Sequence, residues 1–524
     1  MNIKSFSKEI YLFYTVLVLN MLPVLCYTFF PTMDGAAHLY NSNLINELLF
    51  QPQSIVADYF VLNTVPVPNW LGHFVLSFFN LFLPAPIAEK VLLICYMSLL
   101  PLSFRYFTKQ YNSTMLSYLI FPFCYTYLFY LGFYNLSISF ILLFTTLAFW
   151  KKNEQILNYK YVFVLFLLIS TTYFAHIMIY AILIFTLFLM ASQSFLAQLM
   201  SNEIDKKMIR DTINKYVIML VVSLPSLCLL LFFMQQTTFF SSIEKLSTSE
   251  LLTWLIDSRP LIALSYGKEA QLTRIFSVLL LVLLGAVIYS NVKENKDNFW
   301  KKIIHKLLLP QNIYLVVALI MLFLYFKVPN SGSAGMMSDR LCLLFFIYMV
   351  SWLALIKYSK RLTNIAIFVV LVVNFGLVFR YTVATKGLNK DAVSMANATK
   401  YIEPYSVVLP INNTKEWLEP HFSNYLGIDK PMIILENYEA TVGWFPVKWN
   451  ETKIPVLKFG NLGNENTSFT WKSGQLKPEK IIDYVIVWGL ENKMNTTEIT
   501  TLNQYYESIY MSENGAVQLY KLRK

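Results

Sequence analysis

Charged residues are scarce in this sequence: Asp, Glu, Lys and Arg make up 14% of 524 residues, against about a quarter in soluble domains. Hydrophobic residues make up 56%. They come in blocks of about twenty, the length at which a helix crosses ~30 Å of hydrocarbon. This composition excludes an ordinary water-soluble globular protein. We therefore expect an α-helical polytopic membrane protein.

Cysteine is also scarce, and the last of the five cysteines is Cys342, inside an apolar block. The C-terminal part therefore has no disulfide framework and no CxxC metal site. Glycine-rich nucleotide loops of the Walker or Rossmann type are absent, and so is the HExxH zinc motif. The net charge of +11 comes mostly from short loops between apolar blocks, so we expect no nucleic-acid partner.

The apolar blocks predict about eleven membrane spans. They are residues 9–30, 87–104, 113–132, 134–150, 160–175, 177–196, 216–235, 274–291, 311–327, 341–356 and 363–382. Lys and Arg concentrate in alternate loops, which places the N-terminus in the cytoplasm. The richness in Lys, Asn and Ile is typical of low-GC bacteria, so we expect the bacterial inner (plasma) membrane.

The stretch 69–84 is apolar but too short for a span, and counting it would invert every later loop. We interpret it as an amphipathic or re-entrant helix within a long outer loop, residues 31–86. After residue 382, charges become frequent and β-rich runs alternate with helical stretches. The β-rich runs are residues 406–411, 431–436, 483–489, 507–512 and 516–522, and the helical stretches are residues 391–403, 415–426 and 497–506. We predict a transmembrane domain at 1–382 and a small extracytoplasmic α/β domain at 383–524.

Asp34 lies where the chain leaves the first span, with Gly35 next to it and His38 four residues on. One interpretation is structural: Asp34 caps a helix that begins at residue 35 and accepts its backbone N–H bonds. The other is functional: Asp34 is a general base, or an acidic site for a metal or an acceptor, at the membrane–water boundary. The two interpretations are compatible.

The predicted topology gathers further ionisable residues at the outer face, namely His38, His73, His176 and Arg340. For each histidine a structural role is an equal alternative. Arg340 follows a Gly/Ser-rich loop, and its guanidinium can hold a phosphate or extend to the membrane interface. Lys268, in a long outer loop, is a further phosphate candidate, with a solvated loop charge as the alternative.

Five motifs accompany this architecture of a retained first span, an acidic first outer loop, many further spans and an outer C-terminal domain. They are MDGAAHLYNS (33–42), VPNWLGHF (67–74), LGFYNLSIS (131–139), YFAHIMIY (173–180) and SDRLCLLFF (338–346). Together they resemble the GT-C superfamily of membrane glycosyltransferases, in the bacterial branch with protein mannosyltransferase-like and lipopolysaccharide-modifying enzymes.

The resemblance implies an inverting glycosyltransferase that moves a hexosyl or pentosyl group from a polyprenyl-phosphate-linked donor in membrane lipid. The acceptor would be an extracytoplasmic glycan, lipid or protein. The residues implied are Asp34 and His38 for catalysis, Arg340, His176 and Lys268 for the donor phosphate, and His73, Asp58 and Asn69 as further outer-face candidates.

The sequence departs from the family at the first loop. Many members carry an Asp-Glu or Asp-x-Asp pair there, whereas Asp34 is followed by Gly35, and the next acids are Glu47 and Asp58. A divalent cofactor, Mg²⁺ or Mn²⁺, is therefore left open. Two alternatives also stay open: a multi-pass transporter or flippase of a lipid-linked glycan, and a non-catalytic GT-C-like scaffold. A transporter predicts ionisable groups at mid-membrane and broken spans related by an internal repeat. Neither is evident in the sequence, although Pro225 is one interruption within a span.

Overall fold

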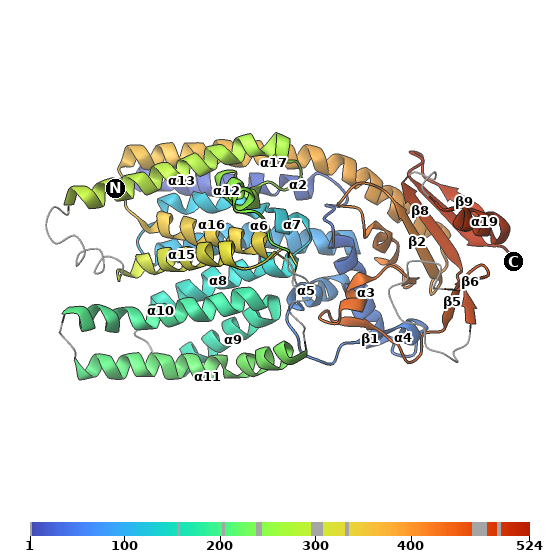
Figure 1. Cartoon of the computed structure of the whole chain (residues 1–524), viewed down its shortest axis with the longest axis horizontal. Coiled ribbons are helices and arrows are strands. Elements are labelled where there is room, and N and C mark those ends of the chain that lie inside the picture. Colours follow the sequence, from blue (N-terminus) through green and yellow to red (C-terminus); the bar gives the residue numbers. More distant parts are fainter. Residues whose placement is uncertain are drawn as a thin grey trace. The chain divides into compact units, whose positions relative to one another are not determined.

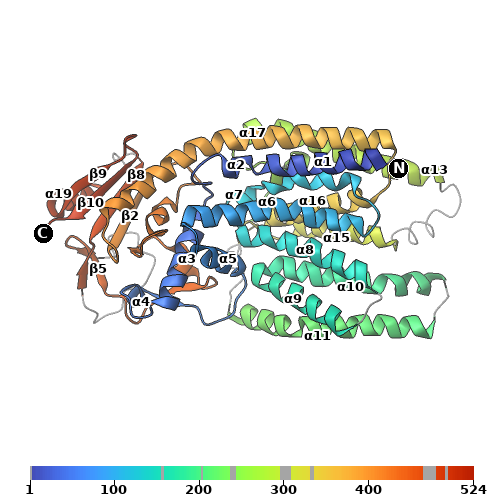
Figure 2. The same ribbon diagram turned by 180° about the vertical axis from the view of Figure 1, so that it is seen from behind.

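Long helices dominate the computed structural model, which describes residues 3–154, 158–201, 205–236, 244–294, 308–330, 335–463, 479–489 and 494–524 (Figures 1 and 2). The chain forms two compact units. The first comprises Met1–Leu22, Cys95–Phe129 and Asn135–Tyr381, and the second comprises Pro23–Ile94, Tyr130–Tyr134 and Thr382–Lys524.

The first unit is helical, and its long helices run side by side (Figures 1 and 2). Its elements are α1 (Ile3–Asn20), η1 (Met115–Cys124), α7 (Tyr127–Tyr130), α8 (Tyr134–Asn153), α9 (Tyr159–Ala175), α10 (Ile177–Ser201), α11 (Lys206–Gln236), α12 (Thr248–Ile256), η2 (Arg259–Leu261), α13 (Tyr266–Glu294), η3 (Pro310–Asn312), α15 (Ile313–Lys327) and α16 (Met337–Leu355). Five of the described helices have residues in both units: α2 (Leu22–Leu25), α6 (Ala85–Lys109), α7, α8 and α17 (Lys360–Ala398).

Eight helices in the described part of the chain are long and apolar enough to cross a membrane. They are Lys8–Leu25, Ala85–Lys109, Tyr134–Asn153, Lys206–Gln235, Tyr266–Ser290, Pro310–Lys327, Met337–Leu355 and Lys360–Tyr401. The other three predicted spans correspond to shorter apolar helical segments, Met115–Tyr130, Tyr159–Ala175 and Ile177–Gln193. The prediction of a polytopic helical membrane protein is confirmed.

The predicted span 113–132 differs most from the structure. It folds as the 3₁₀-helix η1 followed by the short helix α7, and η1 contains Pro122. Proline has no backbone N–H to donate and obstructs the preceding turn, so a continuous α-helix is disfavoured here. Every residue from Leu116 to Cys124 is buried, because an element that is apolar on all sides packs inside the protein.

The second unit contains a five-stranded mixed sheet with strand order β3-β2-β8-β10-β9. Each of the five β-rich runs overlaps one of these strands: β2 (Val407–Asn413), β3 (Ile433–Ile434), β8 (Tyr484–Gly489), β9 (Tyr506–Met511) and β10 (Val517–Leu522). The central strand β8 pairs parallel with β2 and antiparallel with β10, and five of its six residues are buried. Helix α19 (Thr496–Tyr505) matches the predicted helix 497–506 and lies beside β9 (Figure 1).

Two other helical predictions in the tail gave different results. Residues 391–403 are the end of α17 and the short 3₁₀-helix η4 (Thr399–Tyr401), so no separate helix begins there. The predicted helix 415–426 is wrong over its first half, where the chain forms turns, and only η5 (Phe422–Gly427) is helical, as a 3₁₀ segment. Pro420 interrupts that stretch and disfavours an α-helix.

The predicted outer loop 31–86 is structured and belongs to the second unit. It forms α3 (Gly35–Phe50), α4 (Val56–Tyr59), β1 (Phe60–Leu62) and α5 (Leu71–Asn80). Strand β1 pairs antiparallel with β4 (Val447–Trp449), so this loop shares a sheet with the C-terminal part of the chain. Most of α3 is buried, and the Tyr40 hydroxyl donates to the Met432 carbonyl at 2.8 Å. The division of the chain at residue 382 into transmembrane and extracytoplasmic domains stays a prediction.

Helix α5 is the short helix predicted within 69–84. His73 and Leu76 on one face are buried, whereas Phe74 and Phe78 on the other are 45% and 57% exposed. One face therefore packs against the protein and places His73 inside it, where α5 contacts α3.

Candidate functional site

Asp34 stands at the N-cap position of α3, but its carboxylate makes no capping hydrogen bond. The capping interpretation placed Asp34 correctly at the start of the helix, but it is wrong about the side chain, which accepts no capping bond. The backbone of Asp34 is held instead, because its N–H donates to the Leu131 carbonyl at 3.3 Å. The carboxylate is thus left available for other chemistry.

Gly132 makes this arrangement possible. Its φ is +88°, and a Cβ added to it would lie 2.6 Å from the Asp34 Cβ and 2.8 Å from the Asp34 nitrogen. Only glycine combines this left-handed conformation with such a close approach. Gly35 is similarly enclosed, since a Cβ there would lie 2.6 Å from Thr32 Oγ1 and 2.7 Å from the Tyr134 hydroxyl.

The Asp34 carboxyl group is buried, with 5% of the residue exposed. Burial raises its pKa from 3.8 to about 6, although His421, His38 and the Tyr438 hydroxyl act in the opposite direction. Its Oδ1 accepts no hydrogen bond within the described residues, and it lies 3.6 Å from His421 Nε2. A carboxylate that titrates near neutral pH and has an open lone pair is suited to general-base chemistry.

His421 links Asp34 to a second carboxylate. Its Nδ1 lies 2.7 Å from Glu436 Oε1, and its ring stacks on Tyr438 with the centroids 4.4 Å apart. Burial disfavours the charged imidazolium, but the Glu436 and Asp34 carboxylates outweigh it and raise the pKa of His421 to about 9. His421 is therefore a cation at neutral pH that orients Asp34.

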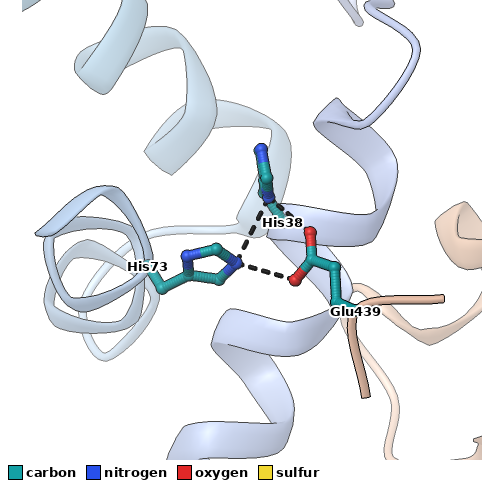
Figure 3. A group of neighbouring side chains, drawn as sticks. All are labelled: His38, His73 and Glu439. Atoms are coloured by element: carbon teal, nitrogen blue, oxygen red, sulfur yellow. Dashed lines mark hydrogen bonds and ion pairs between the residues drawn. The ribbon is translucent and has the colours of Figure 1, made fainter. Parts of the chain in front are cut away.

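A second cluster consists of His38 from α3, His73 from α5 and Glu439 from α18 (Tyr438–Val442), as shown in Figure 3. His38 Nδ1 lies 2.5 Å from Glu439 Oε1 and 3.2 Å from His73 Nε2, which lies 2.7 Å from Glu439 Oε2. All three residues are buried.

His38 and Glu439 form a buried ion pair. Burial opposes both charges, but His38 and His73 lower the pKa of Glu439 to about 2, and Glu439 raises that of His38 to about 9. The pKa of His73 is lowered, since burial outweighs the attraction of Glu439. In the absence of a metal, therefore, His38 is charged, Glu439 is ionised and His73 is neutral.

The residues predicted to bind the donor phosphate lie in the first unit. His176 ends α9, and Arg340 in the first turn of α16 is within electrostatic range of it. Neighbouring Asp339 pairs with Arg259 at 3.5 Å. Lys268 is exposed in the first turn of α13. The structure thus brings His176 and Arg340 together and leaves Lys268 as a surface charge.

The two remaining candidates have different surroundings. Asp58 is exposed and lies 3.7 Å from Lys453 in a surface ion pair, so it does not join the buried clusters. Asn69 has a positive φ of 71° two residues before α5 begins, and its backbone interacts with the His73 ring. Asn69 therefore helps to set the position of His73.

Sequence reasoning missed His421, Glu436, Tyr438 and Glu439. All four come from the part of the chain predicted to be a separate domain. The signal that could have found them is LENYEA (435–440), which places two acids three residues apart beside a tyrosine, together with a histidine in the tail.

These features define a class: a polytopic helical membrane protein with a buried carboxylate directly before α3, at the start of the segment that follows its first helices. The fold is similar to that in the crystal structure of ArnT from Cupriavidus metallidurans bound to undecaprenyl phosphate. The two match with a TM-score of 0.54 over 98% of this chain and 97% of ArnT, at 10% sequence identity. At that identity the likeness shows the fold alone. No protein-family model and no curated protein matches the sequence.

Proposed function

We propose that this protein is an inverting glycosyltransferase that transfers a sugar from a polyprenyl-phosphate-linked donor to a glycan, lipid or protein acceptor outside the cytoplasm. The fold supports this proposal, since it is shared with a protein crystallised with undecaprenyl phosphate. The observation that carries it is the Asp34 carboxylate, which is buried, makes no capping bond and has an Oδ1 that accepts no hydrogen bond from the residues that the structure describes.

In the proposed reaction an acceptor hydroxyl attacks the anomeric carbon from the face opposite the phosphate. The bond between that carbon and the phosphate oxygen breaks, and its electron pair leaves with the polyprenyl phosphate. The hydroxyl proton passes to Asp34 Oδ1, while the charged His421 keeps the carboxylate ionised and oriented. Attack from the opposite face inverts the configuration at the anomeric carbon.

His38 has a positioning role in this proposal. Its Nε2 donates to the Gly132 carbonyl at 2.7 Å, and its Nδ1 faces Glu439 and His73. Both ring nitrogens therefore have partners, and the ring holds the Gly132 segment against Asp34 rather than receiving the proton itself.

We assign the donor phosphate to Arg340 together with His176. A guanidinium offers two parallel N–H donors to phosphate oxygens, and an imidazole can add a third. Lys268 remains a weaker candidate, because its exposed ammonium is well solvated.

The test is a transfer assay on purified protein in lipid, supplied with polyprenyl-phosphate sugars extracted from the host. Loss of the base in Asp34→Asn is expected to lower the transfer rate about 10²–10⁴-fold. Asp205→Asn, at an exposed carboxylate, is the matched control and should transfer normally. Full activity of Asp34→Asn would exclude Asp34 as the base. No transfer from any donor by folded wild-type protein would favour a transporter, a flippase or a scaffold.

A further inference from the structure

We propose that His38, His73 and Glu439 form a zinc site whose ligand atoms are His38 Nδ1, His73 Nε2 and a carboxylate oxygen of Glu439 (Figure 3). This inference does not depend on the transferase activity, because it concerns what these three side chains bind.

The geometry of the three groups fits a tetrahedral ion. Ligand atoms at ~2.0–2.1 Å from zinc are about 3.3 Å from one another in a tetrahedron. The two ring nitrogens already lie 3.2 Å apart, with the ring planes at 82° to each other. The carboxylate oxygens lie 2.5 and 2.7 Å from these nitrogens. If the carboxylate moved outward by less than about 1 Å, its distances to the two ring nitrogens would match those between ligands of a tetrahedral zinc ion.

The surroundings orient these ligands. The Gly132 carbonyl accepts from His38 Nε2 at 2.7 Å, which in the neutral ring leaves the Nδ1 lone pair directed at the cluster. Zinc-binding histidines usually donate their second ring nitrogen to a carbonyl or a carboxylate in this way. Asn41 Nδ2 donates to Glu439 Oε2 at 2.9 Å and holds the carboxylate in place. The lone pairs of two ring nitrogens and a carboxylate repel one another when they face the same point. A proton or a cation between them turns this repulsion into attraction.

The donor set selects zinc over the magnesium or manganese that the resemblance left open. Mg²⁺ prefers oxygen ligands in a near-ideal octahedron and keeps several waters, which a buried pair of imidazoles does not provide. Imidazole with one carboxylate suits Zn²⁺. Three protein ligands leave the fourth position for a water molecule.

Zinc would join three elements that are far apart along the chain. His38 and His73 are separated by 35 residues, and His73 and Glu439 by 366. An ion that binds the folded arrangement and not the unfolded chain stabilises the fold. The His38 N–H also donates to the Asp34 carbonyl at 2.9 Å, so the ion would fasten the helical turn that carries Asp34.

The experiment measures zinc in full-length protein purified without a histidine tag, by mass spectrometry of the metal after chelation and reloading with Zn²⁺. We expect one zinc per chain, removal of which lowers the thermal midpoint. Glu439→Gln and His73→Ala should lose the ion, and Asn41→Ala should bind it about 10–100-fold more weakly. His421→Gln is the matched control, because it removes a histidine paired with a different glutamate, and it should keep one zinc per chain.

Cobalt titration of the wild-type protein gives a second measurement that needs no variant. Co²⁺ bound by two imidazoles and a carboxylate should show the visible absorption of a four-coordinate ion, and Zn²⁺ should displace it. Failure of folded wild-type protein to bind either metal would overturn the proposal. Retention of one zinc by both Glu439→Gln and His73→Ala would overturn it too, and so would its loss in His421→Gln, which would place the ion elsewhere.

Discussion

Gly132 and Asp34 are in direct contact: a Cβ on Gly132 would lie 2.6 Å from the Asp34 Cβ, closer than two carbon atoms can approach without bonding. The same glycine accepts a hydrogen bond from His38 at its carbonyl. A single residue from a distant part of the sequence thus sets the position of the proposed base and of a neighbouring histidine.

Gly132→Ala should therefore displace Asp34 and lower kcat/KM for transfer by about 10²-fold, as expected for a misplacement of about 1 Å. The measurement is steady-state transfer with the donor varied. Gly515→Ala is the control, since Gly515 also has a positive φ, of 67°, but an added Cβ would meet nothing within 4 Å. Both variants carry the strain of a left-handed alanine, about 1–2 kcal/mol. Equal activity of the two would show that contact with Asp34 is unimportant.

Asp34→Asn should stabilise the protein at neutral pH although it lowers the rate of transfer. The folded pKa of Asp34 is raised from 3.8 to about 6 by burial. Its contribution to stability is therefore full below pH 3.8 and is lost as the pH rises through about 6. The ionised group costs roughly 3 kcal/mol, and the asparagine removes that cost. Thermal unfolding in detergent from pH 4 to 8 should show the gap between variant and wild type opening over this interval.

The control for this stability measurement is Asp58→Asn, at an exposed carboxylate paired with Lys453. Its effect should stay within about 0.5 kcal/mol, as for most surface substitutions. If the wild type were more stable than Asp34→Asn at pH 7, the prediction would be wrong, and the neighbouring groups would offset the cost of burying the Asp34 charge.

Stability should fall as the pH rises from about 6.5 to 9 because of His421. Glu436 and Asp34 raise its pKa from 6.5 to about 9 despite burial, with Glu439 adding to the effect. A raised folded pKa means that the stabilisation is full below pH 6.5 and disappears through pH 9. The loss is on the order of 2–3 kcal/mol. His38, whose pKa is also raised to about 9, contributes to the same slope. In His421→Gln the fall of the thermal midpoint over this range should therefore be smaller than in the wild type, whereas an unchanged slope would assign it to His38 or another group.

Arg340→Ala should raise the KM for the lipid-linked donor about 10–100-fold, the value of a charge-assisted hydrogen bond, with a smaller effect on kcat. Arg340→Lys should recover part of the loss, because it restores the charge but not the paired donors. Arg210→Ala, at an exposed arginine of α11, is the control. A normal donor KM in Arg340→Ala would remove this residue from the phosphate site.

The predicted topology places the turn at Asn514 outside the cytoplasm and the start of α17 inside it. A cysteine-free background with Asn514→Cys should react with a membrane-impermeant maleimide in spheroplasts. Lys360→Cys, at an exposed position in α17, should react only after lysis. The reverse pattern would invert the orientation of the whole chain.

Local patterns predicted most of the fold. Helical spans follow from blocks of apolar residues, and β8 follows from the run DYVIVWG, because neither needs knowledge of distant residues. Residues 113–132 looked like another span, but Met115–Cys124, which contains Pro122, forms a largely buried 3₁₀-helix in the first unit. Hydrophobicity alone does not distinguish a helix that faces lipid from one that faces protein.

The candidate site was only half predictable. Asp34, His38 and His73 stood out because ionisable residues beside apolar blocks are costly. Glu439 and His421 did not, since an acid or a histidine in a polar tail resembles ordinary surface. Their roles depend on contacts across hundreds of residues, such as the 2.7 Å pair between His73 and Glu439, and no sequence spacing encodes such a contact.

Strand β1 pairs with β4 from the far end of the chain, so this part of the protein can fold only late in synthesis. The ribosome produces Asp34, His38 and His73 early, and their partners His421 and Glu439 emerge only when most of the chain has been made. Until then the face of α3 that contacts η5 and β4 lacks these partners and is a candidate for chaperone binding. A prematurely terminated chain can insert its helices but never bring His421 and Glu439 to Asp34 and His38, so incomplete products lack the assembled site.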